Sequence, residues 1–315
     1  MDIKEKIVDL DLPAEKRWLF LEAYKTEVNE LLACYLKDFE EATFLFSALG
    51  DYKQAVLRPE YLEEIRSIAS FSRFSEDEVL MANLYYDILK FYFGCTAFAV
   101  RSENTTLHGR NLDWHTDNDL LSKHSMIFDF QKDGKTLFKT VGWPGFIGAL
   151  SGVKPAAFSL TLNAVLSKDK PEIAFPISFL LRDVLATARS YDEAKRILEQ
   201  TPIASDCLLL LSGLGAMEQV VIERTPRRFA SRVSSEGFVV VTNDYKKLEN
   251  GEADNMLQAT SCGRYDRAQS LLRERAPKTA EACLYILQDE DVMMGITVQQ
   301  MVFDNRTGAI TLVKS

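Results

Sequence analysis

The sequence predicts an α+β fold in which two antiparallel sheets lie between outer helices. Two observations lead to this prediction. Residues 1–94 carry apolar residues mostly at helical spacing, whereas strand-like patterns begin at Cys95. Beyond Cys95, groups of strands alternate with pairs of helices until a closing hairpin. The chain has 315 residues, of which 47% are hydrophobic and 26% charged, so it is long enough to bury a large core.

The segment before Cys95 is predicted to be extended over residues 1–12 and then mostly helical. Ser75 is a typical N-cap, and Glu78 three residues later completes a capping box. Helical spacing of apolar residues, or a compact apolar stretch, is found at Ala14–Leu36, Phe39–Leu49, Tyr61–Ser70 and Ser75–Leu89.

The segment from Cys95 onward is predicted to form the sheets. Asp133-Gly134 marks a hairpin turn between strands at Ser125–Gln131 and Thr136–Val141. Helices are expected at Phe179–Ala188, Tyr191–Gln200, Asp266–Glu274 and Thr279–Gln288. Further strands are expected at Phe146–Leu150, Phe158–Asn163, Cys207–Leu211, Glu218–Glu223, Phe229–Val233, Gly237–Thr242, Ile296–Phe303 and Gly308–Val313.

The stretch from Phe93 to Trp114 carries residues suited to thiol chemistry. Cys95 opens one strand, and a second strand carries Arg110 and Asp113 back past its start. Such a hairpin would place a thiol, a guanidinium and a carboxylate at one end of a sheet. A nucleophilic thiolate needs a base and a positive environment, and the α-amine of Cys95 would be that base if the bond after Gly94 were cut. Taken alone, Cys95 also fits a buried small hydrophobe.

These residues resemble the N-terminal-nucleophile hydrolases of the choloylglycine hydrolase group, and more closely the branch of acid ceramidase and N-acylethanolamine acid amidase. Cys95-Thr96 followed by His108-Gly109-Arg110-Asn111-Leu112-Asp113 is similar to that branch almost residue for residue. The similarity continues in the same order over nearly the whole chain, at Asp9–Pro13 with Lys16–Trp18, Gly145–Gly148, Leu150–Gly152, Lys154-Pro155, Phe158–Asn163, Val241–Asn243, and Arg264 before Tyr265.

The resemblance implies that the chain cuts its own Gly94–Cys95 bond. Residues 1–94 would then be a helical pro-segment, the α-subunit, and residues 95–315 an αββα catalytic domain, the β-subunit. Cys95 would be the nucleophile, and its freed α-amine, with a pKa near ~8, would take the thiol proton. Asp113 is expected to hold that amine, and Arg110 to favour the thiolate; a surface ion pair is the alternative for these two residues.

Three further residues are assigned to the site by the same resemblance. Asn243 is expected to donate to the oxyanion, with a turn asparagine as the alternative. Asn163 matches a second pocket position, and Arg264 matches an arginine that organises the nucleophile, although an arginine at a helix start is also possible. Close relatives carry Glu directly after the residue that matches Asn163, where this chain has Ala164, and this difference weakens the transfer of Glu-dependent processing and acid-pH behaviour.

The short apolar loop from Trp143 to Ile147 has two interpretations. It is expected either to line an acyl-chain channel or to belong to the core. Trp114, Trp143 and Phe146 are the candidate substrate-binding residues.

Composition and charge limit the kinds of molecule that this protein is expected to bind. The net charge of −9 and the absence of a basic stripe argue against nucleic acid, and any membrane contact is expected to be hydrophobic and transient. Five scattered cysteines and a polar N-terminus predict a cytoplasmic protein without a signal peptide. No metal-ligand spacing and no phosphate-binding loop are found in the sequence, so no cofactor is expected.

The expected function is hydrolysis of a linear, non-peptide amide with a lipophilic acyl group, through a thioester on Cys95. The resemblance favours amides of the ceramide or N-acylethanolamine type. Conjugated bile acids, penicillin V, N-acyl amino acids and acyl transfer to an amine are alternatives within the same superfamily. A lipid-binding protein that stays uncut and does no catalysis is the alternative from another class.

Overall fold

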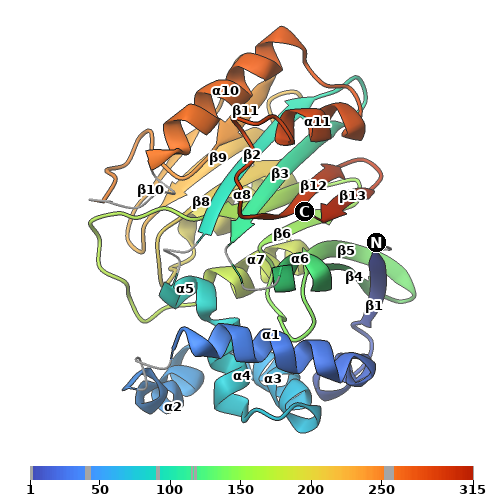
Figure 1. Ribbon diagram of the computed structural model, residues 1–315, viewed down its shortest axis with the longest axis vertical. Coiled ribbons are helices and arrows are strands. Elements are labelled where there is room, and N and C mark those ends of the chain that lie inside the picture. Colours follow the sequence, from blue (N-terminus) through green and yellow to red (C-terminus); the bar gives the residue numbers. More distant parts are fainter. Residues whose placement is uncertain are drawn as a thin grey trace.

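Two sheets that pack against each other form the centre of the molecule. The computed structural model describes residues 3–39, 44–89, 93–114, 116, 119–251 and 259–314. One sheet has eight strands and the other has five, and helices cover their outer faces (Figure 1). The predicted α+β fold of two sheets between helices is therefore confirmed.

The eight-stranded sheet has the order β1-β4-β5-β6-β7-β8-β9-β10. Its neighbouring strands run antiparallel, except that β1 joins β4 in parallel. The prediction of fully antiparallel sheets is wrong at this edge, because the whole helical segment lies between β1 and β4 and supplies the crossover that a parallel pair needs. The strands are β1 (Lys4–Asp9), β4 (Met126–Lys132), β5 (Lys135–Gly142), β6 (Ser151–Lys154), β7 (Phe158–Asn163), β8 (Cys207–Ser212), β9 (Gln219–Arg224) and β10 (Phe229–Arg232).

The five-stranded sheet has the order β11-β2-β3-β12-β13. The predicted hairpin around Cys95 is formed by β2 and β3, and their register places Gly94 opposite Asp113. Its strands are β2 (Phe93–Arg101), β3 (Thr106–Trp114), β11 (Phe238–Val241), β12 (Thr297–Asp304) and β13 (Ile310–Lys314).

Helices of the segment that follows Cys95 cover the outer faces of the two sheets. Figure 1 shows α10 (Ser261–Glu274) and α11 (Ala280–Leu287) beside the five-stranded sheet, where Ala268 and Leu272 join a core with Phe98. Helices α7 (Ile177–Thr187) and α8 (Tyr191–Gln200) pack on the eight-stranded sheet. Between the sheets, small residues such as Ala97 and Ala99 of β2 face Leu208 and Leu210 of β8, which lets the two sheets approach closely.

The segment before Cys95 contributes an edge strand and then helices. The prediction of a single helix at Ala14–Leu36 is wrong, because this stretch is divided into shorter elements. At the first division Trp18 is fully buried, and its indole N–H donates to Glu64 at 2.8 Å. The capping box of Ser75 and Glu78 is present, and residues 40–43 of the Phe39–Leu49 stretch lie outside the described residues. The elements are η1 (Ala14–Lys16), η2 (Leu19–Tyr24), α1 (Lys25–Lys37), α2 (Phe44–Val56), α3 (Pro59–Phe71), α4 (Glu76–Asn83) and α5 (Tyr85–Leu89); α6 (Leu120–His124) follows β3.

A buried ion pair joins the segments on either side of Cys95. Glu64 of α3 is fully buried and accepts from both terminal nitrogens of Arg182 of α7. The same carboxylate accepts from Trp18 and lies 3.2 Å from Arg17. Burial lowers the pKa of Arg182, but Glu64, together with Tyr61 and Glu60, acts in the opposite direction, and the net effect raises it. We call Glu64, Arg182, Trp18 and Arg17 the Glu64 cluster.

The strand expected at Phe146–Leu150 is absent, and an irregular loop stands in its place. Asn83 of α4 explains the difference: its side chain donates to Gly145 O at 2.9 Å and accepts from Ile147 N at 2.8 Å. A side chain therefore satisfies backbone groups that a neighbouring strand would otherwise bind. Gly145, directly before the expected strand, has a φ of +91°, a conformation that glycine adopts readily.

The predicted hairpin turn at Asp133-Gly134 is confirmed. Asp133 has a φ of 51° and Gly134 a φ of 67°. Positive φ at both central positions is the geometry that two-residue hairpin loops favour, since it matches the twist of the flanking strands.

His108 of β3 is buried between the sheets, and its burial predicts how the stability of the protein depends on pH. Its ring nitrogens lie 2.8 Å from Ser159 Oγ and 3.0 Å from Thr161 Oγ1. Burial, together with Arg110, lowers the pKa of His108 from 6.5 to about 3. The unfolded chain therefore binds a proton more readily than the folded one, so the contribution of His108 to stability is complete above pH ~6.5 and falls as pH drops toward ~3.

We expect His108→Gln to flatten this part of the stability profile. Urea unfolding of wild type and variant between pH 7 and pH 4 measures the difference. The gap between the two curves should change by several kcal/mol over that range, at about 1.4 kcal/mol per pH unit. Parallel curves would contradict a neutral, buried His108.

Candidate active site

Cys95 lies near the start of β2 and is buried, with 1% of its surface exposed. The chain is intact here, and the Gly94–Cys95 bond runs within the strand. Cross-strand pairing with β3 brings Asp113 opposite Gly94 and Leu112 opposite Cys95. The candidate nucleophile is therefore held in regular sheet structure with its thiol facing β7, where Leu162 O lies 3.9 Å from Sγ.

Arg110 places its charge beside the thiol. Nη2 donates to Cys95 Sγ at 3.2 Å and also to Leu162 O, while Nη1 donates to Leu150 O and Ser151 Oγ. The side chain is 1% exposed, so these acceptors fix its position in surroundings of low dielectric constant. The guanidinium is therefore a cationic group in direct contact with the candidate nucleophile. The alternative of a surface ion pair is wrong for Arg110.

Asn243 follows β11 and accepts the backbone N–H of Cys95 at 3.1 Å through Oδ1. Its Nδ2 donates to Ala164 O at 2.8 Å, and its own N–H donates to Ser261 Oγ at 2.9 Å. Asn243 is thus in contact with the nucleophilic residue and is not a turn asparagine with only local bonds. In the intact chain its amide is oriented as an acceptor toward Cys95, so the expected oxyanion donor is engaged elsewhere.

Arg264 extends from the first turn of α10 to the same residues. Nη1 donates to Cys95 O at 2.7 Å and to Thr96 Oγ1 at 2.9 Å, and Nη2 donates to Asn243 Oδ1 at 2.8 Å. Burial lowers its pKa, and the nearby Asp113 acts in the opposite direction. Arg264 therefore does more than begin a helix: it fixes both the Cys95 carbonyl and the Asn243 side chain.

Asp113 is fully buried at the end of β3. Thr297 donates to Oδ1 at 2.5 Å, and Oδ2 lies 4.0 Å from Arg264 without a hydrogen bond to any described residue. Burial raises the pKa of Asp113, although Arg264, Thr297 and Arg110 each lower it. Asp113 therefore combines an easily protonated carboxylate with one open acceptor atom.

Two predicted site residues, Asp113 and Asn163, have other partners in the uncut chain. The α-amine that Asp113 is expected to hold exists only after the cut, and before the cut the Cys95 N–H donates to Asn243. An amide nitrogen has one hydrogen to donate, whereas a freed amine has more, so the intact chain can satisfy only one of the two acceptors. Asn163 donates to Val241 O and Thr242 O at 3.3 and 3.0 Å, and these bonds connect the sheets beside the site without contacting the thiol.

Sequence reasoning missed several groups that complete the site. Thr297 of β12 binds Asp113, Thr96 binds Arg264, and Ser151 together with the Leu150 and Leu162 carbonyls binds Arg110. Backbone carbonyls carry no residue-specific signal. Thr297 is found only through the β3–β12 register, which pairs it with Asp113.

The three candidate substrate-binding residues lie together around a small closed cavity. Trp114, Trp143 and Phe146 line it, with Tyr35, Ala82, Tyr85, Tyr86 and Leu150. The ring centroids of Trp114 and Trp143 are 5.8 Å apart in an edge-to-face arrangement. The cavity volume is about 10 Å³, close to the minimum for a single water. In the intact chain this region is therefore packed core.

Features of other site classes are not found in the described part of the chain. It holds no group of three His, Cys, Asp or Glu side chains that could bind a metal ion. None of the described helices combines the length and the apolar character needed to cross a bilayer.

Two facing sheets between helices, with a cysteine near a strand start and a buried arginine at its sulfur, define the class of N-terminal-nucleophile hydrolases. The family model described as acyl-coenzyme A:6-aminopenicillanic acid acyl-transferase matches residues 100–313, and the chain belongs to this family.

Known relatives agree with this assignment. Acid ceramidase from Bos taurus is 32% identical over 250 residues, and that from Homo sapiens is 31% identical over 252 residues. Each match covers 69% of this chain but 62% of the relative, so the chain matches less than two thirds of these proteins. The solved structure of the Caenorhabditis elegans ortholog of N-acylethanolamine-hydrolyzing acid amidase superposes with a TM-score of 0.54 and 25% identity, covering 66% of this chain and 92% of that one.

Proposed function

We propose that this chain is a cysteine amidase that activates itself by cutting the Gly94–Cys95 bond and then hydrolyses linear amides of lipophilic acids. The observation that carries the proposal is the contact of 3.2 Å between Arg110 Nη2 and Cys95 Sγ. The backbone of Cys95 is also hydrogen-bonded, through its N–H to Asn243 and through its carbonyl to Arg264. A merely structural buried cysteine needs none of these charged partners.

Self-cleavage would begin with attack of the Cys95 sulfur on the Gly94 carbonyl carbon. The thiol proton passes to Asp113, which lies opposite Gly94 and has a raised pKa. The C–N bond then breaks, and the proton moves to the leaving nitrogen of Cys95. This leaves a thioester between Gly94 and the sulfur. The new α-amine of Cys95 is already free at this point. Water then hydrolyses the thioester and releases the Gly94 carboxylate and the free thiol.

Turnover of an external amide would use the same atoms. The α-amine takes the thiol proton, the thiolate attacks the acyl carbonyl, and the protonated amine group delivers the proton to the leaving amine, which leaves an acyl thioester on Cys95. Water, deprotonated by the same α-amine, then attacks the thioester carbonyl, and the C–S bond breaks to release the fatty acid and restore the thiol. Asp113 Oδ2, which has no hydrogen-bond partner among the described residues, is available to hold the new ammonium. Asn243 Nδ2 would exchange its bond to Ala164 O for one to the oxyanion.

The acyl group is proposed to lie against Trp114, Trp143 and Phe146. Their cavity of about 10 Å³ is too small for an acyl chain in the intact protein, so the proposal requires it to widen after the cut. The names of the relatives, acid ceramidase and N-acylethanolamine-hydrolyzing acid amidase, favour lipid amides of the ceramide or N-acylethanolamine type. We therefore propose lipid amides as the first substrates to examine.

Intact mass under denaturing and reducing conditions tests the proposal. Fresh protein and protein incubated between pH 4 and pH 8 are compared with the Cys95→Ala variant. We expect wild type to give two fragments that divide between Gly94 and Cys95, and the variant to keep one mass of 35.7 kDa. The cut protein, and not the variant, should release fatty acid from lipid amides.

The burial of the Cys95 thiol in the uncut chain leaves a second candidate, a lipid-binding protein that remains uncut. A single wild-type mass at every pH, with lipid amides bound but not hydrolysed, would support this candidate and overturn the amidase proposal. Equal lipid binding by wild type and Cys95→Ala is expected for the binding protein.

A further inference from the structure

Glu223 of β9 is a fully buried carboxylate that the proposed chemistry does not use. Val221, two residues earlier on the same face of the strand, packs between the sheets with Val241 and Tyr245. Glu223 therefore points toward the five-stranded sheet that carries Cys95. Since a glutamate is almost never fully buried unless it is paired, the partners of Glu223 indicate its role.

The Glu223 carboxylate binds the chain that follows Asn243. It accepts three successive backbone N–H groups, those of residues 246–248, at 2.9, 2.9 and 2.8 Å. Arg232 of β10 lies 3.4 Å from the same carboxylate. A carboxylate can accept all of these bonds because it has about four lone-pair positions and no hydrogen of its own. The segment 244–250 is therefore attached to β9.

Tyr245 gives this segment a second attachment to β9. Its hydroxyl donates to Arg224 O, next to Glu223. Its N–H donates to Asn250 Oδ1 at 2.7 Å, and Asn250 Nδ2 donates back to Tyr245 O at 3.1 Å. The segment is thus closed on itself and held at two adjoining residues of β9, and Asn243 lies directly before it.

The partners of Glu223 also contact the helix that carries Arg264. The guanidinium carbon of Arg232 lies 5.7 Å from the ring centroid of Tyr265, and Lys246 Nζ lies 4.6 Å from the same centroid. Tyr265 directly follows Arg264 in α10. Cations at these distances are attracted to an aromatic ring. The groups that Glu223 binds therefore pack against α10 beside Arg264.

We propose that Glu223 is a positioning residue, which fixes Asn243 and Arg264 in their contacts with Cys95. Asn243 accepts the Cys95 N–H at 3.1 Å, and Arg264 donates to the Cys95 carbonyl at 2.7 Å and to Asn243 at 2.8 Å. Glu223 acts through these two side chains. Its effect on cleavage rests on the proposed function, whereas its effect on Asn243 is measurable in a chain that cannot be cut.

Exchange of the Asn243 side-chain amide with water tests the positioning. NMR of the full-length Cys95→Ala chain with isotope-labelled asparagine reports this amide, and Asn243→Asp assigns its signals by their loss. We expect slow exchange in the parent, because Asn243 is 3% exposed and donates to Ala164 O at 2.8 Å. Glu223→Gln should speed the exchange at least about tenfold, since the NH2 group of glutamine cannot accept an N–H.

The rate of the Gly94–Cys95 cut tests the consequence for chemistry, and intact mass measures it in chains that keep the thiol. Glu223→Gln should slow the cut about 10- to 100-fold, because small displacements of the groups around a reacting bond cost rates of this order. Glu223→Asp should lie between wild type and Glu223→Gln, since aspartate keeps a carboxylate that only accepts. A side chain that merely fills space would give the opposite order, because glutamine has nearly the shape of glutamate.

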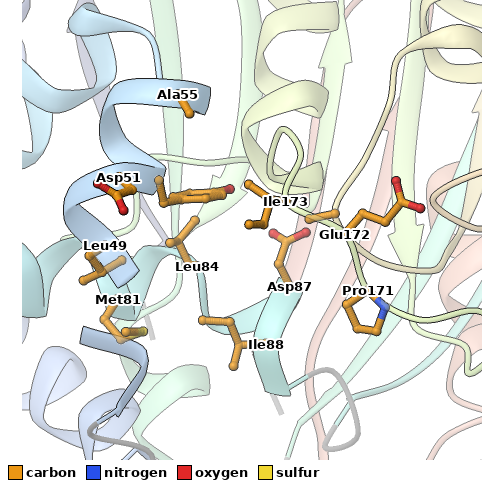
Figure 2. Close-up of a pocket in the computed structure, with 12 residues that line it drawn as sticks. Leu49, Asp51, Ala55, Met81, Leu84, Asp87, Ile88, Pro171, Glu172 and Ile173 are labelled. Atoms are coloured by element: carbon orange, nitrogen blue, oxygen red, sulfur yellow. The ribbon is translucent and has the colours of Figure 1, made fainter. Parts of the chain in front are cut away.

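Glu172→Gln is the matched control. Glu172 pairs with Arg227 in the turn between β9 and β10, as Glu223 pairs with Arg232 of β10. Figure 2 shows Glu172 among the residues that line a cavity of about 380 Å³ at the N-terminal helices. Its removal takes one carboxylate from the same pair of strands and should leave both rates within about twofold of the parent.

Asn250→Ala keeps the test open if Glu223→Gln does not fold. It removes both bonds to Tyr245 from a half-buried position, and it should speed the exchange of Asn243 about threefold. Unchanged exchange in a folded Glu223→Gln chain, or in Asn250→Ala, would overturn the proposal, as would a wild-type rate of cleavage in Glu223→Gln. A wild-type chain that stays uncut would contradict the amidase proposal alone, and the exchange rates would then decide the positioning role.

Discussion

Replacing Arg110 with methionine is expected to slow cleavage at Gly94–Cys95 about 100- to 1,000-fold. The guanidinium is the charge closest to the sulfur, at 3.2 Å, and it is 1% exposed. Removal of one preorganised donor to a developing charge typically costs roughly 2.7–4 kcal/mol, which is the basis of the expected range. Methionine keeps much of the side-chain volume, but it removes both the charge and the hydrogen bonds that Arg110 donates to Leu150 O, Ser151 Oγ and Leu162 O.

The measurement is the rate at which two fragments appear in intact-mass spectra. Arg110→Lys should give an intermediate rate, because an ammonium keeps the charge but lacks the planar fork that binds two carbonyls and the thiol together. Arg101→Met is the matched control, since Arg101 lies at the far end of β2 and donates to Leu214 O. Cleavage of a folded Arg110→Met variant at the wild-type rate would rule out this role for Arg110.

Glu64→Gln is expected to lower the free energy of unfolding by about 3–5 kcal/mol, because it leaves the buried Arg182 without its counter-charge. Glu64 is fully buried, and its partners lie on both sides of the proposed cut. The effect should therefore be larger in the cut protein, where the Glu64 cluster helps to hold two separate chains together. Urea unfolding in the Cys95→Ala background gives the value for the intact chain.

Two companion variants separate charge from packing. Glu60→Gln is the control, because Glu60 pairs with the same Arg17 but its side chain is 51% exposed, and such pairs contribute at most about 1 kcal/mol. The double variant Glu64→Leu/Arg182→Met should be more stable than either single charge deletion, since it leaves no unpaired buried charge. A loss below about 1 kcal/mol in Glu64→Gln would contradict the assigned role of the Glu64 cluster.

The sequence was sufficient to predict the positions of most helices and strands and the group of residues that contacts Cys95. Periodicity located most strands within two residues, because each is bounded by turn residues and has a buried face. The motif resemblance brought Arg110, Asn243 and Arg264 together, and the structure places all three in contact with Cys95.

Contacts between residues far apart in the sequence could not be predicted from local sequence patterns. The parallel pairing of β1 depends on which sheet edge is open after the fold is complete. The loop at Phe146–Leu150 looked like a strand because its apolar pattern gives no sign that Asn83 binds its backbone. The acceptor of the Cys95 N–H depends on relative positions of β2, β11 and α10 that no local pattern specifies.

The parallel edge strand β1 has a consequence for how the two proposed chains depend on each other. It covers β4, whose sequence Met126-Ile127-Phe128-Asp129-Phe130 is strongly apolar. A fragment that began at Cys95 would leave the hydrogen-bonding groups of β4 open to any other extended chain, which is a common origin of aggregation. If the proposed cut occurs, residues 1–94 should remain bound to the rest of the chain, and recombinant production of residues 95–315 alone should yield insoluble protein.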